Sequence, residues 1–318
     1  MPSVCDKCGK NPVIFIRYSG QHLCADHFLD LLRRRVKKEM RLQRVFRKGR
    51  KIAVAVSGGK DSLLLLKLTH EIASVFKESD LVAVTIDEGI GGYRPSSVEI
   101  TEKFTRENEI DWRLISYGKL FGHTLDEMVG SLKMGPCSIC GILRRKALNS
   151  GASETGSGIL LTGHNLDDTA QTILMNVMQA DVSRLARLGP HLDPIEGFVP
   201  RAMPLRTTPE TETYLAALLL GLPLHELECP YAESAKRGHY RDLLMKAEEE
   251  TPGTRHSLLK FNEQVAPLIP RGDPKTNPCV NCGEPVIVSE GKSICRSCAL
   301  MDRLKAGKGM IKHEEKEA

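Results

Sequence analysis

Residues 57–62, with the sequence SGGKDS, lie between two strongly apolar runs. The run before them, residues 52–56, is short and rich in β-branched residues, which is typical of a buried strand in a parallel sheet. The run after them starts at Leu63 and continues as a helix towards Val75 and Phe76. A glycine turn between a strand and a helix directs free backbone N–H groups at one point. The sequence therefore predicts an anion site here, of the kind that holds a phosphate.

The side chains of this turn suit the same purpose. Its two glycines allow the backbone to approach a ligand closely, and its two serines can donate hydroxyl hydrogen bonds. Lys60 is a point charge for phosphate oxygens, and Asp61 is a candidate for holding a magnesium ion. The spacing differs from the Walker A loop, which needs four residues between its glycines. An ordinary strand-to-helix turn is the alternative interpretation.

The rest of the central region alternates strands with helices. Further strands are expected over residues 81–86, 112–115 and 158–163. Helices are expected over residues 96–107, with Ser96 or Ser97 as its cap, 214–222 and 234–249. This order predicts an α/β fold with a doubly wound, open parallel sheet. Ligands of such sheets bind at the carboxyl ends of the strands, so the loops that begin at Ser57, Asp87 and Gly163 should converge.

Residues 163–171, GHNLDDTAQ, open the helix after the fourth strand. Glycine at a strand end permits close approach of a ligand, and either Asn165 or Asp167 can cap the helix. Asp168 is placed to position magnesium or to handle a proton near a nucleotide phosphate. Helix capping alone is the alternative role for these acidic residues.

The chain has 10 cysteines, and a cytoplasmic protein rarely keeps so many in disulfides. Cys5 and Cys8 are followed by Cys24 and His27, and two such pairs offer four ligands to a tetrahedral zinc ion. His22 is a competing fourth ligand, but His27 has the matching two-residue gap. Near the other end, the pairs Cys279/Cys282 and Cys295/Cys298 flank a strand-like stretch at residues 286–288 and predict a zinc ribbon.

Three cysteines remain after both zinc sets are assigned. Cys137 and Cys140 form a third pair, and Cys229 stands alone. Three thiolates suit an iron–sulfur cluster in which one iron lacks a protein ligand. A redox-active dithiol and buried structural cysteines are the alternatives, and spacing does not decide between them.

Positive charge is concentrated between residues 33 and 51, which hold eleven basic residues and one acidic residue, Glu39. The whole chain carries a formal net charge of only +5. Such a segment favours contact with a nucleic-acid backbone, although a solvated helix face is the common alternative. No apolar run reaches the roughly 20 residues of a membrane span, and no apolar signal region follows Met1, so we expect a cytoplasmic protein without membrane contact.

These observations predict six segments. They are an N-terminal zinc finger at 1–32, a basic linker helix at 33–50, a nucleotide-binding catalytic domain at 51–250, a proline-rich linker at 251–278, a zinc ribbon at 279–304 and a charged tail at 305–318.

The ordered set of motifs resembles one family. An N-terminal zinc finger, SGGKDS, a Cys-x-x-Cys pair with a distant third cysteine, GHNxxD and a C-terminal zinc ribbon are similar to the tRNA 2-thiouridine synthetases of the cytoplasmic and archaeal type. These belong to the PP-loop ATP pyrophosphatases. One branch thiolates the wobble uridine and the other a T-loop uridine. Arg144-Arg145 after the cysteine pair resembles the wobble branch, whereas the T-loop branch tends to place lysine where Arg144 stands.

The resemblance implies a two-step reaction. ATP adenylates uridine at O2 with release of pyrophosphate, and sulfur delivered through a [4Fe–4S] cluster on Cys137, Cys140 and Cys229 then replaces AMP. The expected catalytic residues are Lys60, Asp61, Arg144 and Asp168. The expected ATP contacts are Ala55, Ser57, Gly58, Gly59, Lys60, Asp61, Ser62, Ile86, Gly163 and Asp168.

The resemblance also implies ATP, Mg²⁺, the cluster and two Zn²⁺ as bound groups. The implied partners are tRNA, a ubiquitin-like thiocarboxylate carrier or free sulfide as sulfur source, and a second copy or a related subunit. T-loop uridine thiolation, tRNA cytidine 2-thiolation and a non-enzymatic zinc-ribbon RNA-binding protein remain as alternatives.

Overall fold

The computed structural model describes residues 4–75, 79–132, 134–225, 227–232, 237–270, 276–287 and 293–314, with no side-chain description at 287 and 307–314. Phe76, Val288, residues 234–236 of the helix predicted over 234–249, and residues 315–318 of the predicted tail lie outside these ranges.

Among the described residues, five strands form one parallel sheet in the order β5-β4-β3-β6-β7. They are β3 (Ile52–Ala55), β4 (Leu81–Asp87), β5 (Asp111–Ser116), β6 (Ile159–Leu161) and β7 (Arg201–Ala202). The predicted α/β fold with a parallel sheet is confirmed, although the sequence did not reveal the two-residue edge strand β7. The order reverses direction between β3 and β6, which is where ligands of such sheets bind.

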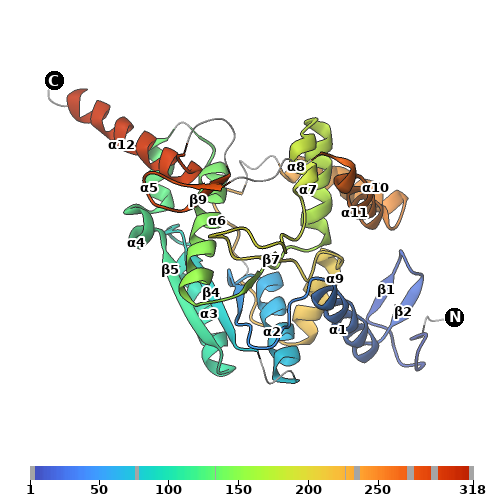
Figure 1. The fold of residues 1–318 in the computed structure, drawn as a ribbon. Coiled ribbons are helices and arrows are strands. Elements are labelled where there is room, and N and C mark those ends of the chain that lie inside the picture. The colour runs from blue at the N-terminus through green and yellow to red at the C-terminus, as the bar shows by residue number, and fades with distance from the viewer. Residues whose placement is uncertain are drawn as a thin grey trace.

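Helices cover both faces of the sheet (Figure 1). Both faces need cover because successive residues of β3 are buried on opposite sides. Ile52 and Val54 pack into the core on one face, and Ala53 packs into the core on the other. The first face is covered by α1 (Ala25–Leu42), α2 (Lys60–Val75), α3 (Arg94–Glu107) and α9 (Glu210–Leu219). The second is covered by α4 (Tyr117–Phe121), α5 (Leu125–Ser131), α6 (Pro136–Glu154) and α12 (Arg296–Glu314).

A further group of helices packs around α7 (Leu166–Met178) at one end of the sheet. It consists of α8 (Val182–Ala186), α10 (Arg237–Glu250), α11 (Thr254–Val265) and the 3₁₀ turn η1 (Ala266–Leu268). None of the helices within the described ranges is both long and apolar enough to span a bilayer.

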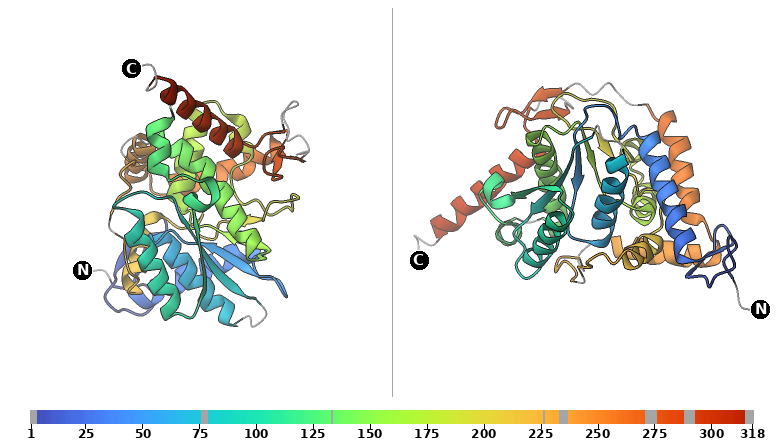
Figure 2. Two further views of the ribbon diagram at one scale, coloured as in Figure 1. Left: turned by 90° about the vertical axis from the view of Figure 1, so that its left-hand side faces the viewer. Right: turned by 90° about the horizontal axis from the view of Figure 1, so that it is seen from below.

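Two small antiparallel hairpins lie at opposite ends of the molecule, as Figures 1 and 2 show. The N-terminal hairpin pairs β1 (Ile14–Ile16) with β2 (Gln21–Leu23), and the C-terminal one pairs β8 (Thr276–Pro278) with β9 (Pro285–Ile287). Each hairpin lies beside one of the two predicted zinc sets. The two strands of each hairpin are only three residues long, so these small modules contain little secondary structure.

A buried network attaches the N-terminal module to the central region. The hydroxyl of Tyr18 donates to Glu212 Oε1 (2.5 Å), and Arg35 donates to Glu212 Oε2 (2.6 Å) and to the Tyr18 hydroxyl (2.7 Å). The ring of His256 lies 4.4 Å from that of Tyr18. Glu212 is only 2% exposed, so its charge depends on Arg35 for compensation.

The basic linker helix predicted over residues 33–50 differs in its bounds. Helix α1 starts at Ala25 and ends at Leu42, so it crosses the expected boundary at residue 32. The reason is a continuous apolar stripe: Phe28, Leu32 and Val36 recur every four residues and are buried. The zinc module and the helix therefore form one unit.

Three other expectations need correction. The linker predicted at 251–278 contains α11, whose Leu259 is buried where it packs on α7. The tail predicted from residue 305 continues α12 as far as Glu314. Neither Ser96 nor Ser97 caps α3, because the helix already begins at Arg94, and the Ser97 hydroxyl instead donates to the Arg94 carbonyl.

We expect Glu212→Gln to destabilise the protein by about 3 kcal/mol, because Arg35 would then be a buried cation without its counter-charge. Thermal unfolding measures the effect. Glu107→Gln is the control, since its pair with Lys103 is exposed and 4.0 Å long, and it should change stability by less than about 0.5 kcal/mol. Equal midpoints for the two variants would contradict this role of Glu212.

Candidate active site

The loop after β3 is held by its own serines. Ser62 Oγ accepts a hydrogen bond from the Ser57 N–H (3.1 Å) and donates to the Gly59 carbonyl (2.8 Å). Ser57 Oγ accepts from the Gly59 N–H (3.4 Å). Helix α2 begins directly afterwards, and the first N–H groups of a helix have no carbonyl partner within it. The loop therefore presents the helix N-terminus as an anion site.

Gly58 is required by the backbone of this loop. Its φ of +84° lies in the left-handed region, and a Cβ atom there would lie 2.4 Å from the Ser97 carbonyl oxygen. Gly59 is different, because its added Cβ would meet only Ser57 Oγ, at an ordinary 3.5 Å. The backbone thus requires glycine at position 58 but leaves space for a side chain at position 59.

The loops after β3 and β6 meet where the strand order reverses. A Cβ on Gly163 would lie 3.1 Å from the backbone of Asp61, so the two loops approach each other closely here. Asn165 caps α7: its side chain accepts from the Asp168 N–H (3.0 Å), and Asp168 Oδ2 accepts from the Asn165 N–H (3.2 Å). The Asn165 amide also donates to Asp61 Oδ1 (3.3 Å). Asn165 therefore bridges Asp61 and Asp168, which lie on its two sides.

Lys60 is not the free charge that the sequence suggested. Its ammonium lies 3.0 Å from Asp61 Oδ2 and 2.7 Å from Glu210 Oε1. Burial alone would lower the pKa of Lys60, but the two carboxylates raise it, because a half-buried ammonium needs counter-charges. Asp61 Oδ1 also accepts a hydrogen bond from Thr213 (2.5 Å). A phosphate that reaches Lys60 must compete with these partners.

Asp168 has a second partner besides the helix cap. Arg237, from α10, lies 3.1 Å from Asp168 Oδ1 and also donates to Thr172. The neighbouring His164 is exposed, and its ring lies 3.0 Å from the Thr162 hydroxyl. The capping role that the sequence left open for Asp168 is therefore real, and its carboxylate is shared with an arginine.

Arg94 connects the ends of β3 and β4. Its guanidinium donates to the Ser57 carbonyl (3.0 Å) and to the Ile86 carbonyl, and its Nε lies 2.7 Å from Glu88 Oε2. Arg94 is 3% exposed. Ile86 is an expected ATP contact, and its carbonyl accepts a hydrogen bond from this buried guanidinium, which needs several acceptors.

Glu88 continues this connection to the cysteine helix. Its Oε1 accepts from Arg144 Nε on α6 (2.8 Å), and Glu88 is 1% exposed. Burial alone would lower the pKa of Arg144, but the Glu88 charge raises it. We call Arg94, Glu88 and Arg144 the ion triad. No sequence pattern pointed to Glu88 or Arg94, apart from the position of Glu88 just after a buried strand.

Contacts connect the segment of Cys229 with the helix that carries Cys137 and Cys140, although the three sulfurs do not all lie within 4.8 Å of one another. Cys140 and Cys229 pack in the same core, and Cys137 Sγ lies 3.8 Å from the Tyr231 carbonyl, two residues beyond Cys229. Tyr117 donates its hydroxyl to the Cys140 carbonyl (3.1 Å), and burial raises the pKa of the Cys140 thiol. Three thiols from two separate segments suit an iron–sulfur cluster better than a local dithiol.

The N-terminal zinc set assembles as predicted. The ligand atoms of Cys5, Cys8, Cys24 and His27 all lie within 4.8 Å of one another. Burial opposes ionisation of Cys5, but nearby backbone N–H groups lower the pKa of its thiol to about 6. His22 takes no part in this set; its ring stacks on Phe15, with centroids 4.4 Å apart.

The C-terminal set has the same construction. Cys279, Cys282, Cys295 and Cys298 place their sulfurs within 4.8 Å of one another, and the pKa of Cys279 is about 6 because backbone N–H groups outweigh its burial. Lys146 of α6 donates to Cys282 Sγ (3.1 Å), so this module is attached to the helix that carries Cys137 and Cys140. Four thiols at this separation are the donors that zinc prefers.

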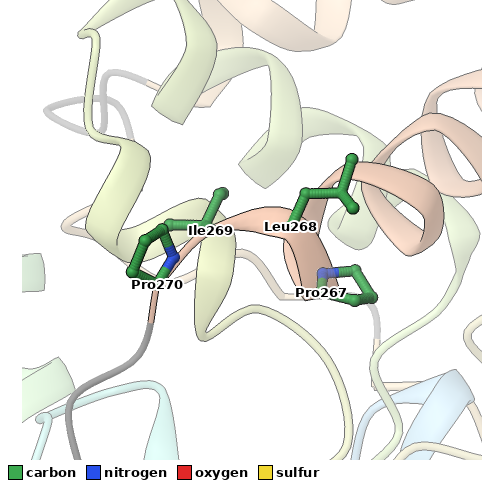
Figure 3. Close-up of a pocket in the computed structure, with 4 residues that line it drawn as sticks. All are labelled: Pro267, Leu268, Ile269 and Pro270. Carbon is green, nitrogen blue, oxygen red and sulfur yellow. The ribbon is translucent and has the colours of Figure 1, made fainter.

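Two hollows lie away from the nucleotide loop. One of about 410 Å³ is lined by Pro267, Leu268, Ile269 and Pro270 at η1 (Figure 3). Another of about 300 Å³ lies at the opposite ends of the strands, beside Asp111 and Trp112. The first is lined by residues at η1 and the second lies at the amino-terminal ends of the strands, so neither coincides with the nucleotide loop.

The two glycines of the loop give a matched test. Gly58→Ala should lower the thermal midpoint and abolish nucleotide binding, because the new methyl group would collide with backbone. Gly59→Ala should leave the midpoint near that of the wild type. Thermal unfolding and nucleotide titration measure both effects, and a Gly58→Ala protein as stable as Gly59→Ala would refute the conformational requirement.

Comparison with known proteins agrees with this geometry. A family model described as the N-terminal LIM domain of the 2-thiouridine synthetase TtuA matches residues 4–29, and a PP-loop domain model matches residues 32–193. The tRNA 2-thiolation protein NcsA of Haloferax volcanii is 38% identical over 95% of this chain and 99% of its own. The cytoplasmic tRNA 2-thiolation protein 1 of Xenopus laevis is 31% identical over 96% of this chain and 90% of its own.

A solved structure resembles the whole chain. The U34-tRNA thiolase NcsA from Methanococcus maripaludis, determined with its [4Fe-4S] cluster, has a TM-score of 0.83 and 34% identity, covering 94% of this chain and 96% of its own. Sequence and structure agree over nearly the full length. This chain belongs to the family of PP-loop tRNA 2-thiolation proteins.

Proposed function

We propose that this protein uses ATP to replace the O2 atom of the wobble uridine of tRNA by sulfur. The observation that carries the proposal is the ion triad, which links the nucleotide loop at Ser57 to Arg144, one turn from Cys140 on the same helix. An activation site and a sulfur site so connected can act on one bound base. The names of the Haloferax and Methanococcus relatives support tRNA as the substrate.

The nucleotide loop performs the activation step. The phosphates of ATP bind at the α2 N-terminus, with adenine near Ile86 and Gly163, where the Ile86 carbonyl keeps its hydrogen bond from Arg94. The uridine O2 atom bonds to the α-phosphorus, the bond to the bridging oxygen breaks, and pyrophosphate leaves. Lys60 and Arg144 stabilise the negative charge that develops, with Lys60 exchanging its carboxylate partners for phosphate oxygens.

Asp61 and Asp168 are the candidate magnesium ligands. Their carboxylate oxygens are the donors that Mg²⁺ prefers, and Asn165 holds the two side chains beside each other. Both carboxylates are paired here, Asp61 with Lys60 and Asp168 with Arg237. Binding of the ion would therefore replace one or both of these ion pairs.

Cys137, Cys140 and Cys229 form the sulfur site. A [4Fe–4S] cluster held by three cysteines would leave one iron open to a sulfur atom. In the second step a sulfur nucleophile bonds to C2 of the adenylated base, the C2–O bond breaks, and AMP leaves. The sulfur comes from a ubiquitin-like thiocarboxylate carrier or from free sulfide.

The remaining proposals concern the metal modules, the tRNA body, the assembly and the location of the protein. The two four-ligand sets hold one Zn²⁺ each and keep the small modules folded. The exposed basic residues of α1 contact the tRNA body. A second copy or a related subunit completes the assembly, and the cytoplasm is its location, in agreement with the printed name of the Xenopus relative.

A direct assay tests the function. The reconstituted protein is incubated without oxygen with Mg²⁺-ATP, sulfide and unmodified tRNA, and sulfur-containing nucleosides are mapped by mass spectrometry of nuclease fragments. Thiouridine in the anticodon fragment is the expected result. Thiouridine in the T-loop would transfer the mechanism to the second candidate substrate. Thiocytidine, or no thiolation, would refute the proposal.

Two cysteine variants separate catalysis from folding. Cys229→Ala should reduce thiolation to background while the midpoint and ATP binding stay near wild type, because Cys229 is only partly buried and lies outside the helices and strands. Cys279→Ala should destabilise the C-terminal module, because a buried metal ligand is lost. Thermal unfolding, ATP titration and the thiolation assay distinguish them. Unfolding of the Cys229 variant would contradict its assignment to the sulfur site.

A further inference from the structure

Three arginines from distant parts of the chain meet beside the C-terminal cysteine set. Arg201 of β7 donates to the Arg145 carbonyl on α6 (3.0 Å). The next residue, Lys146, contacts Cys282, whose sulfur lies 3.7 Å from Cys295. Arg296 follows Cys295 and begins α12, which packs on α6. We call Arg145, Arg201 and Arg296 the arginine cluster.

The arginine cluster has no counter-charge within the described part of the chain: no carboxylate lies within 4.0 Å of any of its three guanidinium groups. Its neighbours on α6 differ, because Arg144 pairs with Glu88 and Lys146 with Glu284. A group of like charges without an acid is costly unless an anion binds.

The pKa values of Arg145 and Arg201 shift in the direction expected for cations without a counter-charge. Partial desolvation lowers the pKa of Arg145 although the residue reaches the surface, and the charges of Arg296 and Arg184 lower it further. Burial also lowers the pKa of Arg201, with a contribution from Arg145. Arg184 differs from the cluster because it pairs with Asp181 (3.0 Å). Arg145 is therefore repelled by both other members of the arginine cluster, and an incoming anion would relieve this repulsion.

We propose that the arginine cluster binds backbone phosphates of the tRNA next to the target uridine. The proposal rests on the function proposed above. Planar guanidinium groups match phosphate oxygens in pairs, which favours phosphodiesters as the ligand. Arg144 and Arg145 are adjacent on α6. Arg144 belongs to the ion triad, and Arg145 belongs to the arginine cluster. A base that reaches the sulfur site must leave its stack, so its flanking phosphates need anchors of this kind.

The C-terminal cysteine set positions the arginine cluster. Arg296 directly follows the metal-ligand candidate Cys295, and Pro285 lies against the loop that leads to β7. A Cβ on Gly197 in that loop would lie 2.6 Å from Pro285 Cγ, so the two segments are closely packed. This gives the C-terminal module a role in substrate binding as well as in folding.

The arginine cluster differs from the basic segment that the sequence emphasised. Two of the arginines on α1 are engaged in packing, Arg33 with Glu71 and Arg35 with Glu212. Helix α1 also lies at the opposite end of the molecule from α12 (Figure 1). The α1 segment is therefore placed for the tRNA body, and the arginine cluster for the nucleotides around the reactive base.

The test measures tRNA affinity at several salt concentrations. The double variant Arg145→Gln/Arg201→Gln should weaken binding at least about tenfold, and the slope of log K against log salt should fall by about 0.7–0.9 for each phosphate that the variant no longer neutralises. The affinity for ATP and the absorbance of the reconstituted iron–sulfur cluster should stay unchanged. The control Arg106→Gln/Arg113→Gln also removes two exposed charges, from α3 and β5, and should bind tRNA as the wild type does.

The single variant Arg296→Gln keeps the test valid if the double variant folds poorly, because Arg296 is exposed. Wild-type affinity and salt slope in Arg296→Gln and in a folded double variant would overturn the inference. So would normal tRNA binding combined with loss of binding to an acidic sulfur-carrier protein. Failure of the wild-type protein to bind tRNA would instead refute the proposed function, so the two failures are distinguishable.

Discussion

The ion triad is the interaction on which the rest of the site depends. Glu88 is almost fully buried, and its two carboxylate oxygens pair with different arginines, Oε2 with Arg94 and Oε1 with Arg144. Arg94 also binds the Ser57 and Ile86 carbonyls, so it fixes the ends of two neighbouring strands. The same carboxylate thereby sets the position of the nucleotide loop and the orientation of the cysteine helix.

Local patterns allowed much of the fold and site to be predicted. The SGGKDS turn, the capping role of Asn165 and both zinc sets depend on residues close together in the chain, where spacing determines geometry. The partners of Lys60 could not be predicted, because Glu210 lies 150 residues away and reaches it only through the packing of α9 on α2. The acidic partner of Arg144 was missed for the same reason.

Charge patterns were less reliable guides than motif patterns. The basic segment at residues 33–51 suggested one continuous nucleic-acid surface, yet Arg35 serves to compensate the buried Glu212. The arginine cluster was invisible in the sequence, because its members come from α6, β7 and α12. Proline content likewise suggested a linker where α11 packs against α7, since burial of an amphipathic face outweighed the prolines around it.

The central claim is that nucleotide binding and the sulfur site are coupled through the ion triad. Electron paramagnetic resonance of the reduced cluster, recorded with and without a non-hydrolysable ATP analogue, tests it most directly. The account predicts that the analogue changes the spectrum of the wild-type protein and leaves that of Glu88→Gln unchanged, although both bind the analogue. A wild-type spectrum indifferent to the nucleotide, or an equal response in the variant, would contradict it.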